Sequence, residues 1–229
     1  MSERLTGISS MATRLVLRQM TEDYARRDGI EVVIEAVGGI DAAKRVQAGE
    51  TFDLVFLSSE AIDKLIDAQR VVAGSKIDIV RSGIAVAVRA GARHPAIDSE
   101  SALKQAVLSA RTVGYSTGPS GVALQKLFER WDIAEALKDR IVQAQPGIPV
   151  GLMVASGDVE LGFQQLSELL AVTGIDIVGP LPPEVQITTT FCGGVCSISQ
   201  HAAAARELLA FMTSAATDEA KKKQGMEPA

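Results

Sequence analysis

Small polar residues and glycines follow apolar, strand-like segments at three places in this 229-residue chain. These junctions are Ser9-Ser10, Gly38-Gly39 and the loop from Ser116 to Gly121. An amphipathic helix pattern follows each junction, so the first-turn N–H groups of three helices have no partner within their own helix. Such a helix end carries about half a positive charge and suits a small anion. No catalytic triad or metal-ligand cluster accompanies the junctions. The pattern therefore predicts a protein that holds a small oxyanion or carboxylate.

Each junction also has a purely structural interpretation. Ser9 or Ser10 can cap the helix that follows while the other serine donates to a ligand. Gly38-Gly39 can form a tight turn, or can let a ligand approach the backbone closely. The loop at 116–121 offers hydroxyls or can simply cap a surface helix. Its candidate ligand contacts are Ser116, Thr117, Ser120 and Gly121.

Two further positions are candidates because of their setting. Gln164 and Gln165 lie where a strand pattern changes to a helix pattern, the place where α/β proteins form sites. We expect one of them to face a ligand, with surface exposure as the alternative. Arg81 is the only basic residue inside a long apolar stretch, and its planar fork could hold a carboxylate or pair with a surface acid.

Composition and charge narrow the function classes. The chain is 47% apolar and only 4% aromatic, which is typical of α/β proteins whose parallel strands are buried on both faces. The net charge of -5 argues against a nucleic-acid partner. No apolar run approaches the roughly 18 residues that span a bilayer. The residues after Met1 lack a secretory signal pattern, so we expect a cytoplasmic protein, or a periplasmic one from which a leader has been removed.

The two cysteines, Cys192 and Cys196, are not expected to form a disulfide. In one strand they would lie about 13 Å apart, and bridged Cα atoms lie within about 7 Å. The glycines between them could break the strand and bring the thiols closer. We interpret both as small buried residues, with a thiol near the ligand as the alternative.

Strand and helix patterns alternate along the chain, which indicates an α/β fold with mostly parallel sheets. The predicted strands are 4–8, 31–37, 53–57, 77–90, 112–116, 140–144, 159–163, 175–178 and 185–198. The predicted helices are 11–27, 40–48, 60–70, 99–109, 120–130, 149–156, 164–170 and 200–223. The end of the chain, 221–229, is expected to fray into solvent.

Two of these strands, 77–90 and 185–198, far exceed the usual length of about five or six residues. Each has glycine near its centre. They are predicted to be hinge strands between lobe 1 (1–82 plus 195–229) and lobe 2 (83–194). One large sheet with two long strands is the alternative.

Several segments resemble those of the type 2 periplasmic-binding-protein fold, and most closely the molybdate-binding proteins of ABC importers. They are Gly7 to Ala12, Phe52 to Ser58, Gly157 to Gly162, Ala205 to Thr213 and Ala220 to Met226. The resemblance covers nearly the whole chain. It implies two lobes, each a mostly parallel sheet flanked by helices, that close on a small anion without a cofactor or metal. It also implies an ABC permease as partner if the chain is exported.

The resemblance implies where ligand contacts lie. The family's first serine corresponds to Ser9 or Ser10, and its second serine falls at Gly38-Gly39, where only backbone donors remain. Its other contacts fall near Ser120-Gly121, near Pro149, and at Gln164, where the family has a tyrosine. Ser58 ends one of the resembling segments and completes the candidate set. The two changed positions put molybdate itself in doubt and leave a small anion.

The segment Leu161 to Leu169 also resembles a branch of the superfamily without a signal peptide, whose members are allylic isomerases such as aconitate isomerase. Such an enzyme moves a proton across a three-carbon unit and needs a base and dienolate-stabilising donors. No His or Glu lies at the three junctions, so no catalytic base is assigned. A ligand-sensing domain is a third class, disfavoured because no helix-turn-helix pattern precedes it.

Overall fold

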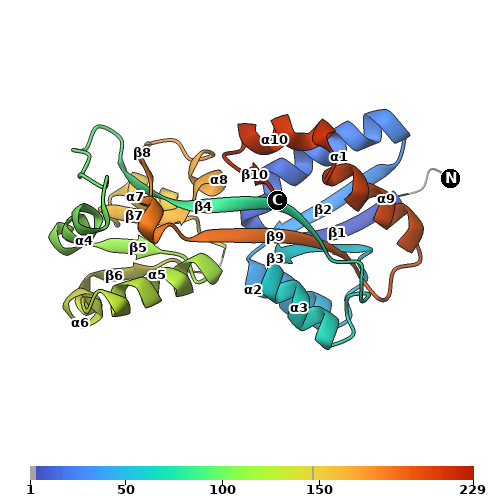
Figure 1. Cartoon of the computed structure of the whole chain (residues 1–229), viewed down its shortest axis with the longest axis horizontal. Coiled ribbons are helices and arrows are strands. Elements are labelled where there is room, and N and C mark those ends of the chain that lie inside the picture. Colours follow the sequence, from blue (N-terminus) through green and yellow to red (C-terminus); the bar gives the residue numbers. More distant parts are fainter. Residues whose placement is uncertain (1–3, 146) are drawn as a thin grey trace. The chain divides into compact units, whose positions relative to one another are not determined.

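The computed structural model describes residues 4–145 and 147–229. Residues 1–3, which belong to the segment used above to judge a leader, lie outside this description. The chain forms two compact units. Unit 1 comprises Met1–Ser82 and Thr190–Ala229, and unit 2 comprises Gly83–Thr189. Strands β4 (Ile77–Arg89) and β9 (Thr188–Val195) each contribute residues to both units (Figure 1).

Unit 1 is built on three parallel strands: β1 (Arg4–Ser10), β2 (Glu31–Val37) and β3 (Leu54–Ser58). Strand β1 lies in the middle, and β9 runs antiparallel to β3. The short β10 (Glu227–Pro228) pairs with β4. The helical segments are η1 (Met11–Thr13), α1 (Arg14–Asp28), α2 (Gly39–Gln47), α3 (Ser59–Asp67), α9 (Ala202–Met212), η4 (Ala215–Thr217) and α10 (Asp218–Lys223).

Helices cover both faces of the unit 1 sheet, as Figure 1 shows. Helices α1 and α9 bury their apolar sides in one core with β1, β3 and β9. Helices α2 and α3 bury theirs in a second core on the other face, together with Cys192 and Cys196. Both cysteines are buried free thiols. The strands are thus covered on both sides, as the apolar composition predicted.

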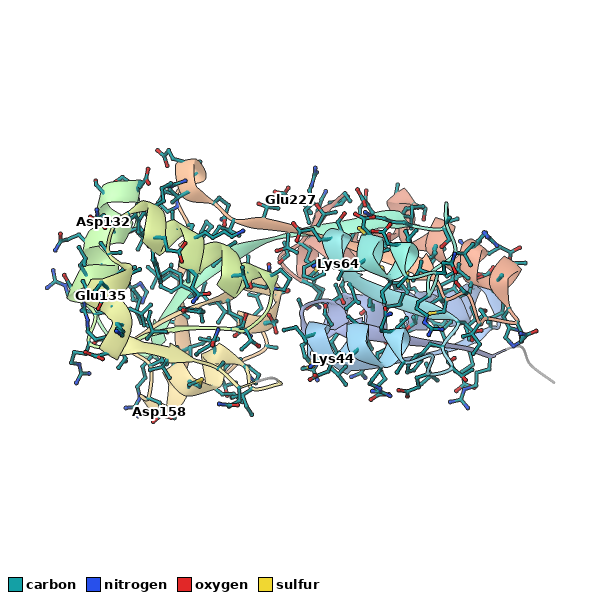
Figure 2. All side chains as sticks on the ribbon, turned by 90° about the horizontal axis from the view of Figure 1, so that it is seen from below. Lys44, Lys64, Asp132, Glu135, Asp158 and Glu227 are labelled. Atoms are coloured by element: carbon teal, nitrogen blue, oxygen red, sulfur yellow. The ribbon has the colours of Figure 1, made fainter. Side chains whose placement is uncertain are left out.

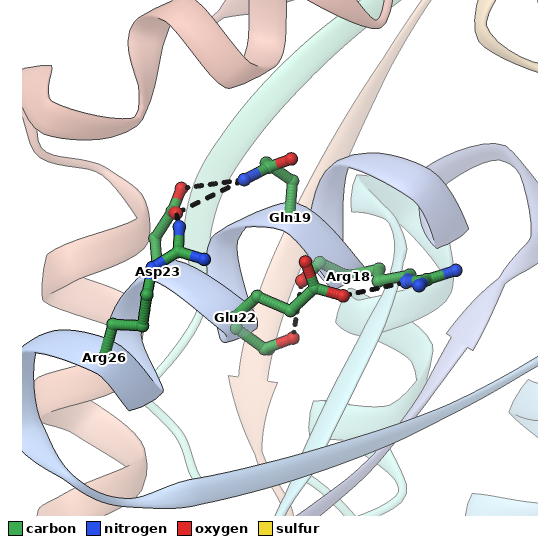
Figure 3. A network of polar contacts seen from close by, with 6 residues as sticks. Arg18, Gln19, Glu22, Asp23 and Arg26 are labelled. Atoms are coloured by element: carbon green, nitrogen blue, oxygen red, sulfur yellow. Dashed lines mark hydrogen bonds and ion pairs between the residues drawn. The ribbon is translucent and has the colours of Figure 1, made fainter.

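Helix α1 shows how sequence pattern sets orientation. Its buried residues include Leu17, Met20 and Tyr24, which lie on one stripe. Its polar residues interact along the helix (Figure 3): Arg18 donates to Glu22 at 2.9 Å, and Asp23 accepts from both Gln19 and Arg26. The helix ends where Gly29 adopts a left-handed conformation (φ 73°), a usual helix stop.

Unit 2 contains the parallel strands β5 (Val113–Tyr115), β6 (Ile141–Gln143) and β7 (Leu161–Gln165), with β5 between the other two. Strand β4 runs antiparallel to β7 and to β8 (Ile175–Pro180). The helical segments are α4 (Glu100–Ser109), α5 (Pro119–Arg130), α6 (Ala134–Leu137), η2 (Lys138–Arg140), α7 (Val150–Ser156), α8 (Leu166–Leu169) and η3 (Pro183–Val185). Residues of α4 and α5 pack against β4, β5 and β7 in the main core.

The structure corrects three sequence-based boundaries. Strand β7 extends through Gln165, so the predicted helix 164–170 shrinks to the single turn of α8. The predicted helix 200–223 breaks into α9, η4 and α10, because Ser214 adopts an extended conformation (φ -75°, ψ 155°). Strand β9 is shorter than 185–198, since Pro182 and Pro183 start the short helix η3.

The end of the chain does not fray, contrary to the sequence-based expectation. Lys221 and Met226 are buried, and β10 pairs with Arg81 and Val80 of β4. The sequence carries no periodic signal over so short a segment, so tertiary contacts decide its structure.

Candidate functional site

The carboxyl ends of β1, β2 and β3 bring five candidate residues to one edge of the unit 1 sheet. Ser10 pairs in register with Val37, and Ser9 pairs with Phe56, so the three parallel strands end side by side. We call this place edge 1, and it consists of Ser9, Ser10, Gly38, Gly39 and Ser58. Helices η1, α2 and α3 all begin here. Three helix starts therefore share one edge of one unit.

The hydroxyls of Ser9 and Ser10 are buried without a hydrogen-bond partner among the described residues. Ser9 is 0% exposed and Ser10 is 6% exposed. Buried polar groups are nearly always paired, and an unpaired one costs about 1–3 kcal/mol. A Cβ atom placed on Gly39 would lie 3.5 Å from the Cβ of Ser10, so the start of α2 adjoins this serine. The unpaired hydroxyl of Ser10 therefore belongs to a residue that lies next to the backbone at the start of α2.

The helix starts at edge 1 lack the side-chain caps that normally satisfy them. The N-cap residues Ser10, Gly38 and Ser58 make no capping side-chain hydrogen bond. Helix α4 shows the contrast, since Ser99 accepts from the backbone N–H of Ala102 at 3.2 Å. The capping interpretation of Ser10 is therefore wrong. The N-terminal ends of α2 and α3 are left for another acceptor.

A second group of candidates lies at the carboxyl ends of β5, β6 and β7, which we call edge 2: Ser116, Thr117, Ser120, Gly121, Pro149 and Gln164. Ser116 and Ser120 have their hydroxyl oxygens 3.4 Å apart. Gly118, the N-cap of α5, offers no side-chain cap. Pro149 precedes α7 as its N-cap. Hydroxyls and an uncapped helix start thus occur together at edge 2 as well.

Both glutamines are buried at the end of β7, so their predicted alternative of surface exposure is wrong. The Oε1 atom of Gln164 accepts from the backbone N–H of Gly151 in the first turn of α7, at 3.1 Å. This contact consumes one helix N–H and leaves the amide NH₂ of Gln164 as the group available to donate. Gln165 donates through Nε2 to Thr189 Oγ1 at 2.9 Å, while its Oε1 has no described partner.

Arg81 contacts the end of the chain. Its Nη2 donates to the backbone oxygen of Pro228 at 3.0 Å, and it pairs in register with Glu227. The residue is exposed. Its observed role is to secure β10 against β4.

The structure shows a polar chain next to edge 1 that the sequence analysis missed. Lys76 Nζ donates to Ser59 Oγ and to Asp63 Oδ1, each at 2.7 Å, and Cys192 donates to Asp78 at 2.9 Å. Burial and the adjacent Asp78 raise the pKa of Cys192 to about 12. The thiol therefore stays protonated and is a poor nucleophile. The only sequence feature that could have indicated these polar contacts is Ser59, which follows Ser58 at the start of α3.

No set of three or more His, Cys, Asp or Glu side chains could hold a metal ion within 4–145 and 147–229. In the same ranges, none of the helices combines the length and apolar character that a bilayer crossing requires. The polar groups at both edges are neutral hydroxyls, amides and backbone N–H groups, the donor set that small anions need.

Comparison with known proteins identifies a matching family and a similar relative. Residues 5–227 match the family described as bacterial extracellular solute-binding protein. The chain is 38% identical over 232 residues to an aconitate isomerase from Pseudomonas sp., covering 98% of this chain and 87% of that protein.

Solved structures show the fold. The periplasmic molybdate-binding protein of Azotobacter vinelandii superposes with a TM-score of 0.80 at 20% identity, over 97% of this chain and 98% of that one. The sulfate-binding protein SubI of Mycobacterium tuberculosis H37Rv gives 0.79 at 16% identity, over 99% and 87%. The predicted α/β, type 2 periplasmic-binding-protein fold is confirmed, and so is the predicted resemblance to its molybdate-binding and isomerase branches.

Proposed function

Because the chain belongs to the family of bacterial extracellular solute-binding proteins, we propose that it binds a small oxyanion or carboxylate through neutral donors. The buried, unpaired hydroxyls of Ser9 and Ser10 beside uncapped helix starts are the observation that carries this proposal. An anion accepts hydrogen bonds without donating any, so it would satisfy donors that the protein leaves unpaired.

A carboxylate fits edge 1 better than a tetrahedral metal oxyanion. The position that the molybdate-binding family fills with a second serine is Gly38-Gly39 here, so it offers backbone N–H donors and no hydroxyl. One carboxylate group presents two oxygens to edge 1, whereas a tetrahedral oxyanion has four oxygens to satisfy. The proposed ligand is therefore a small di- or tricarboxylate that places one carboxylate group at edge 1, with molybdate, tungstate and sulfate as the competing ligands.

A thermal-shift series tests the proposal with molybdate, tungstate, sulfate, citrate, cis-aconitate and trans-aconitate. A ligand at a hundredfold excess over its dissociation constant should add about 2.7 kcal/mol to the free energy of unfolding. We expect a stabilising shift from a polycarboxylate. If no anion of the series stabilises the protein, the binding proposal fails. If only molybdate, tungstate or sulfate stabilises it, the carboxylate assignment is wrong.

A second candidate function is isomerisation of aconitate, favoured by the 38% identical relative that matches 98% of the chain. A base would remove a proton from the CH₂ carbon of trans-aconitate, and the double bond would move to that carbon. The far carbon of the three-carbon unit would then take up a proton, so the composition is unchanged. The neutral donors at edge 1 would stabilise the negative charge of the dienolate.

Proton NMR in D₂O distinguishes this function from binding alone. Isomerase activity would convert trans-aconitate to cis-aconitate and incorporate deuterium into the three-carbon unit. A Ser10→Ala variant should lose most of this activity, and Ser197→Ala, which changes an exposed serine of the same unit, should retain it. A pure binding protein would return trans-aconitate unchanged and unlabelled while still showing the thermal shift.

The two functions imply different partners and locations. A receptor would deliver its ligand to an ABC permease and would work outside the cytoplasm, whereas an isomerase of a metabolic acid would work inside it. Fractionation of the native cells with an antibody to this protein separates the two. A periplasmic signal favours the receptor, and a cytoplasmic signal favours the isomerase.

A further inference from the structure

A surface cavity of about 380 Å³ lies in unit 2, away from edge 2. Its lining comes from the end of β4, the loop after it, the end of α4 and the start of β7. Its volume lies within the range of about 300–1,000 Å³ that ligand pockets occupy. The cavity is therefore large enough for a small organic molecule.

Three exposed arginines line this cavity: Arg89, Arg93 and Arg111. Only Arg111 has a carboxylate partner among the described residues, donating through Nε to Glu160 Oε2 at 3.0 Å. That carboxylate also accepts from the backbone N–H of Arg111 at 2.8 Å. Two of the three arginines are thus left without an acid, in a chain whose net charge is -5.

Neighbouring groups stabilise the positive charge of Arg89 but not that of Arg93. Arg89 lies close to Gly157, where an added Cβ atom would be 3.6 Å from its Nη1, so it also faces the C-terminal end of α7. A cation is favourable there. Asp158, labelled at the periphery of unit 2 in Figure 2, accepts from Ser156 at 2.7 Å. For Arg93 the described residues provide no acceptor.

Apolar side chains also line the cavity. Ala92, Pro95 and Ala106 are at least partly exposed and form an apolar wall, while Val88, Ala110, Val159 and Leu161 are buried. An apolar wall next to unpaired guanidinium groups suits a molecule that has an anionic head and an apolar body. The planar fork of arginine binds carboxylate and phosphate with two parallel hydrogen bonds.

The cavity is separate from edge 2. Leu161 begins β7 and Arg111 precedes β5, so the cavity lies at the amino ends of these parallel strands. Gln164 and the loop at 116–121 lie at the carboxyl ends. Leu161 and Gln165 are four residues apart in an extended strand, about 13 Å.

We infer that this cavity is a second binding site, which takes a small organic phosphate or carboxylate with an apolar body. Arg89 and Arg93 bind the anionic head, and the apolar wall formed by Ala92, Pro95 and Ala106 contacts the body. The inference does not depend on what binds at edges 1 and 2.

Amide NMR titration of the whole protein tests the site. Phenyl phosphate and benzoate supply the two head groups on the same body, and inorganic phosphate supplies a head alone. We expect phenyl phosphate or benzoate, at millimolar concentration, to shift the amides of residues 88–93 and 157–161. The ligand that gives the larger shifts identifies the head group.

Paired variants make the result decisive. The double variant Arg89→Gln with Arg93→Gln should weaken binding about tenfold or more, as loss of charge-assisted hydrogen bonds predicts. The double variant Arg14→Gln with Arg206→Gln changes the charge equally in unit 1 and should bind as the wild type does. The site is refuted if neither probe shifts these amides, if the first double variant binds normally, or if inorganic phosphate binds as tightly as phenyl phosphate.

Discussion

The buried hydroxyls of Ser9 and Ser10 are expected to lower the stability of the protein without ligand and to strengthen the binding of an anion. Their buried hydroxyls have no described partner, so the protein without ligand carries an uncompensated desolvation cost. Replacing Ser9 by alanine should therefore leave the free energy of unfolding unchanged or raise it by about 1 kcal/mol. The same change should weaken binding of the stabilising anion about tenfold, through loss of one hydrogen bond to a charged group.

Chemical denaturation and titration of the Ser9→Ala and Ser10→Ala variants measure both effects. Ser197→Ala is the control, because this serine is exposed. Loss of stability with unchanged affinity would mean that the hydroxyls serve the fold and not the ligand.

Glycine is required at position 121 because the neighbouring backbone leaves no room for a side chain. A Cβ atom at this position would collide with the backbone carbonyl of Ser116, which folds over the first turn of α5. Because backbone and not a flexible side chain is in the way, Gly121→Ala should destabilise the protein by about 3 kcal/mol or more.

Gly118→Ala is the matched control for this prediction. It lies in the same loop, where the nearest atom to an added Cβ is the Ser116 hydroxyl at 3.7 Å, and its backbone (φ -74°) suits any residue. Thermal unfolding of the two variants compares them directly. Equal melting temperatures would show that Ser116 can move aside without cost.

At the scale of elements, local sequence patterns predict the order of strands and helices and the residues at their junctions. Strand–helix alternation predicted the junctions at Ser9-Ser10 and Gly38-Gly39, and the parallel pairing of β1 with β2 and β3 brings them together with Ser58 at edge 1. Contacts between distant segments were not predictable in this way. The hydrogen bond that Gly151 donates to Gln164 and the one that Gln165 donates to Thr189 depend on how α7 and the start of β9 lie relative to β7.

Helix α10 shows the same limit and provides a test. Three successive lysines end this helix, and the sequence suggested that all were solvated. The side chain of Lys221 is only 2% exposed, and it lies 3.5 Å from Asp218. Burial lowers the pKa of Lys221, so the folded state holds its proton less tightly than the unfolded state.

The stability of the protein should therefore rise with pH between the lowered pKa of Lys221 and its ordinary value near 10.5. Below this window the full cost of burying the ammonium is present. Lys221→Met should raise the free energy of unfolding by about 1 kcal/mol at neutral pH and remove that rise. Denaturant unfolding across the pH range measures this, with the exposed Lys222→Met as control. A destabilised Lys221→Met protein with an unchanged pH profile would contradict it.

At the scale of the whole molecule, two opposite electrostatic effects act on the proposed anionic ligand. Neutral hydroxyls and helix starts attract an anion over a few ångströms, whereas the net charge of -5 repels it at longer range. A basic receptor would show the opposite long-range sign. The two contributions separate experimentally, because salt screens long-range repulsion much more than contacts at a buried site.

The association rate of a tricarboxylate should therefore increase as salt is raised from low ionic strength to about 0.15 M, where the screening length is about 8 Å. The dissociation rate should change little, since the contacts at edge 1 are buried. Stopped-flow measurement with trans-aconitate or citrate, whichever stabilises the protein, tests this, and a singly charged carboxylate should show a weaker dependence. An association rate that falls with salt would mean that a field of basic side chains, and not neutral donors, guides the anion.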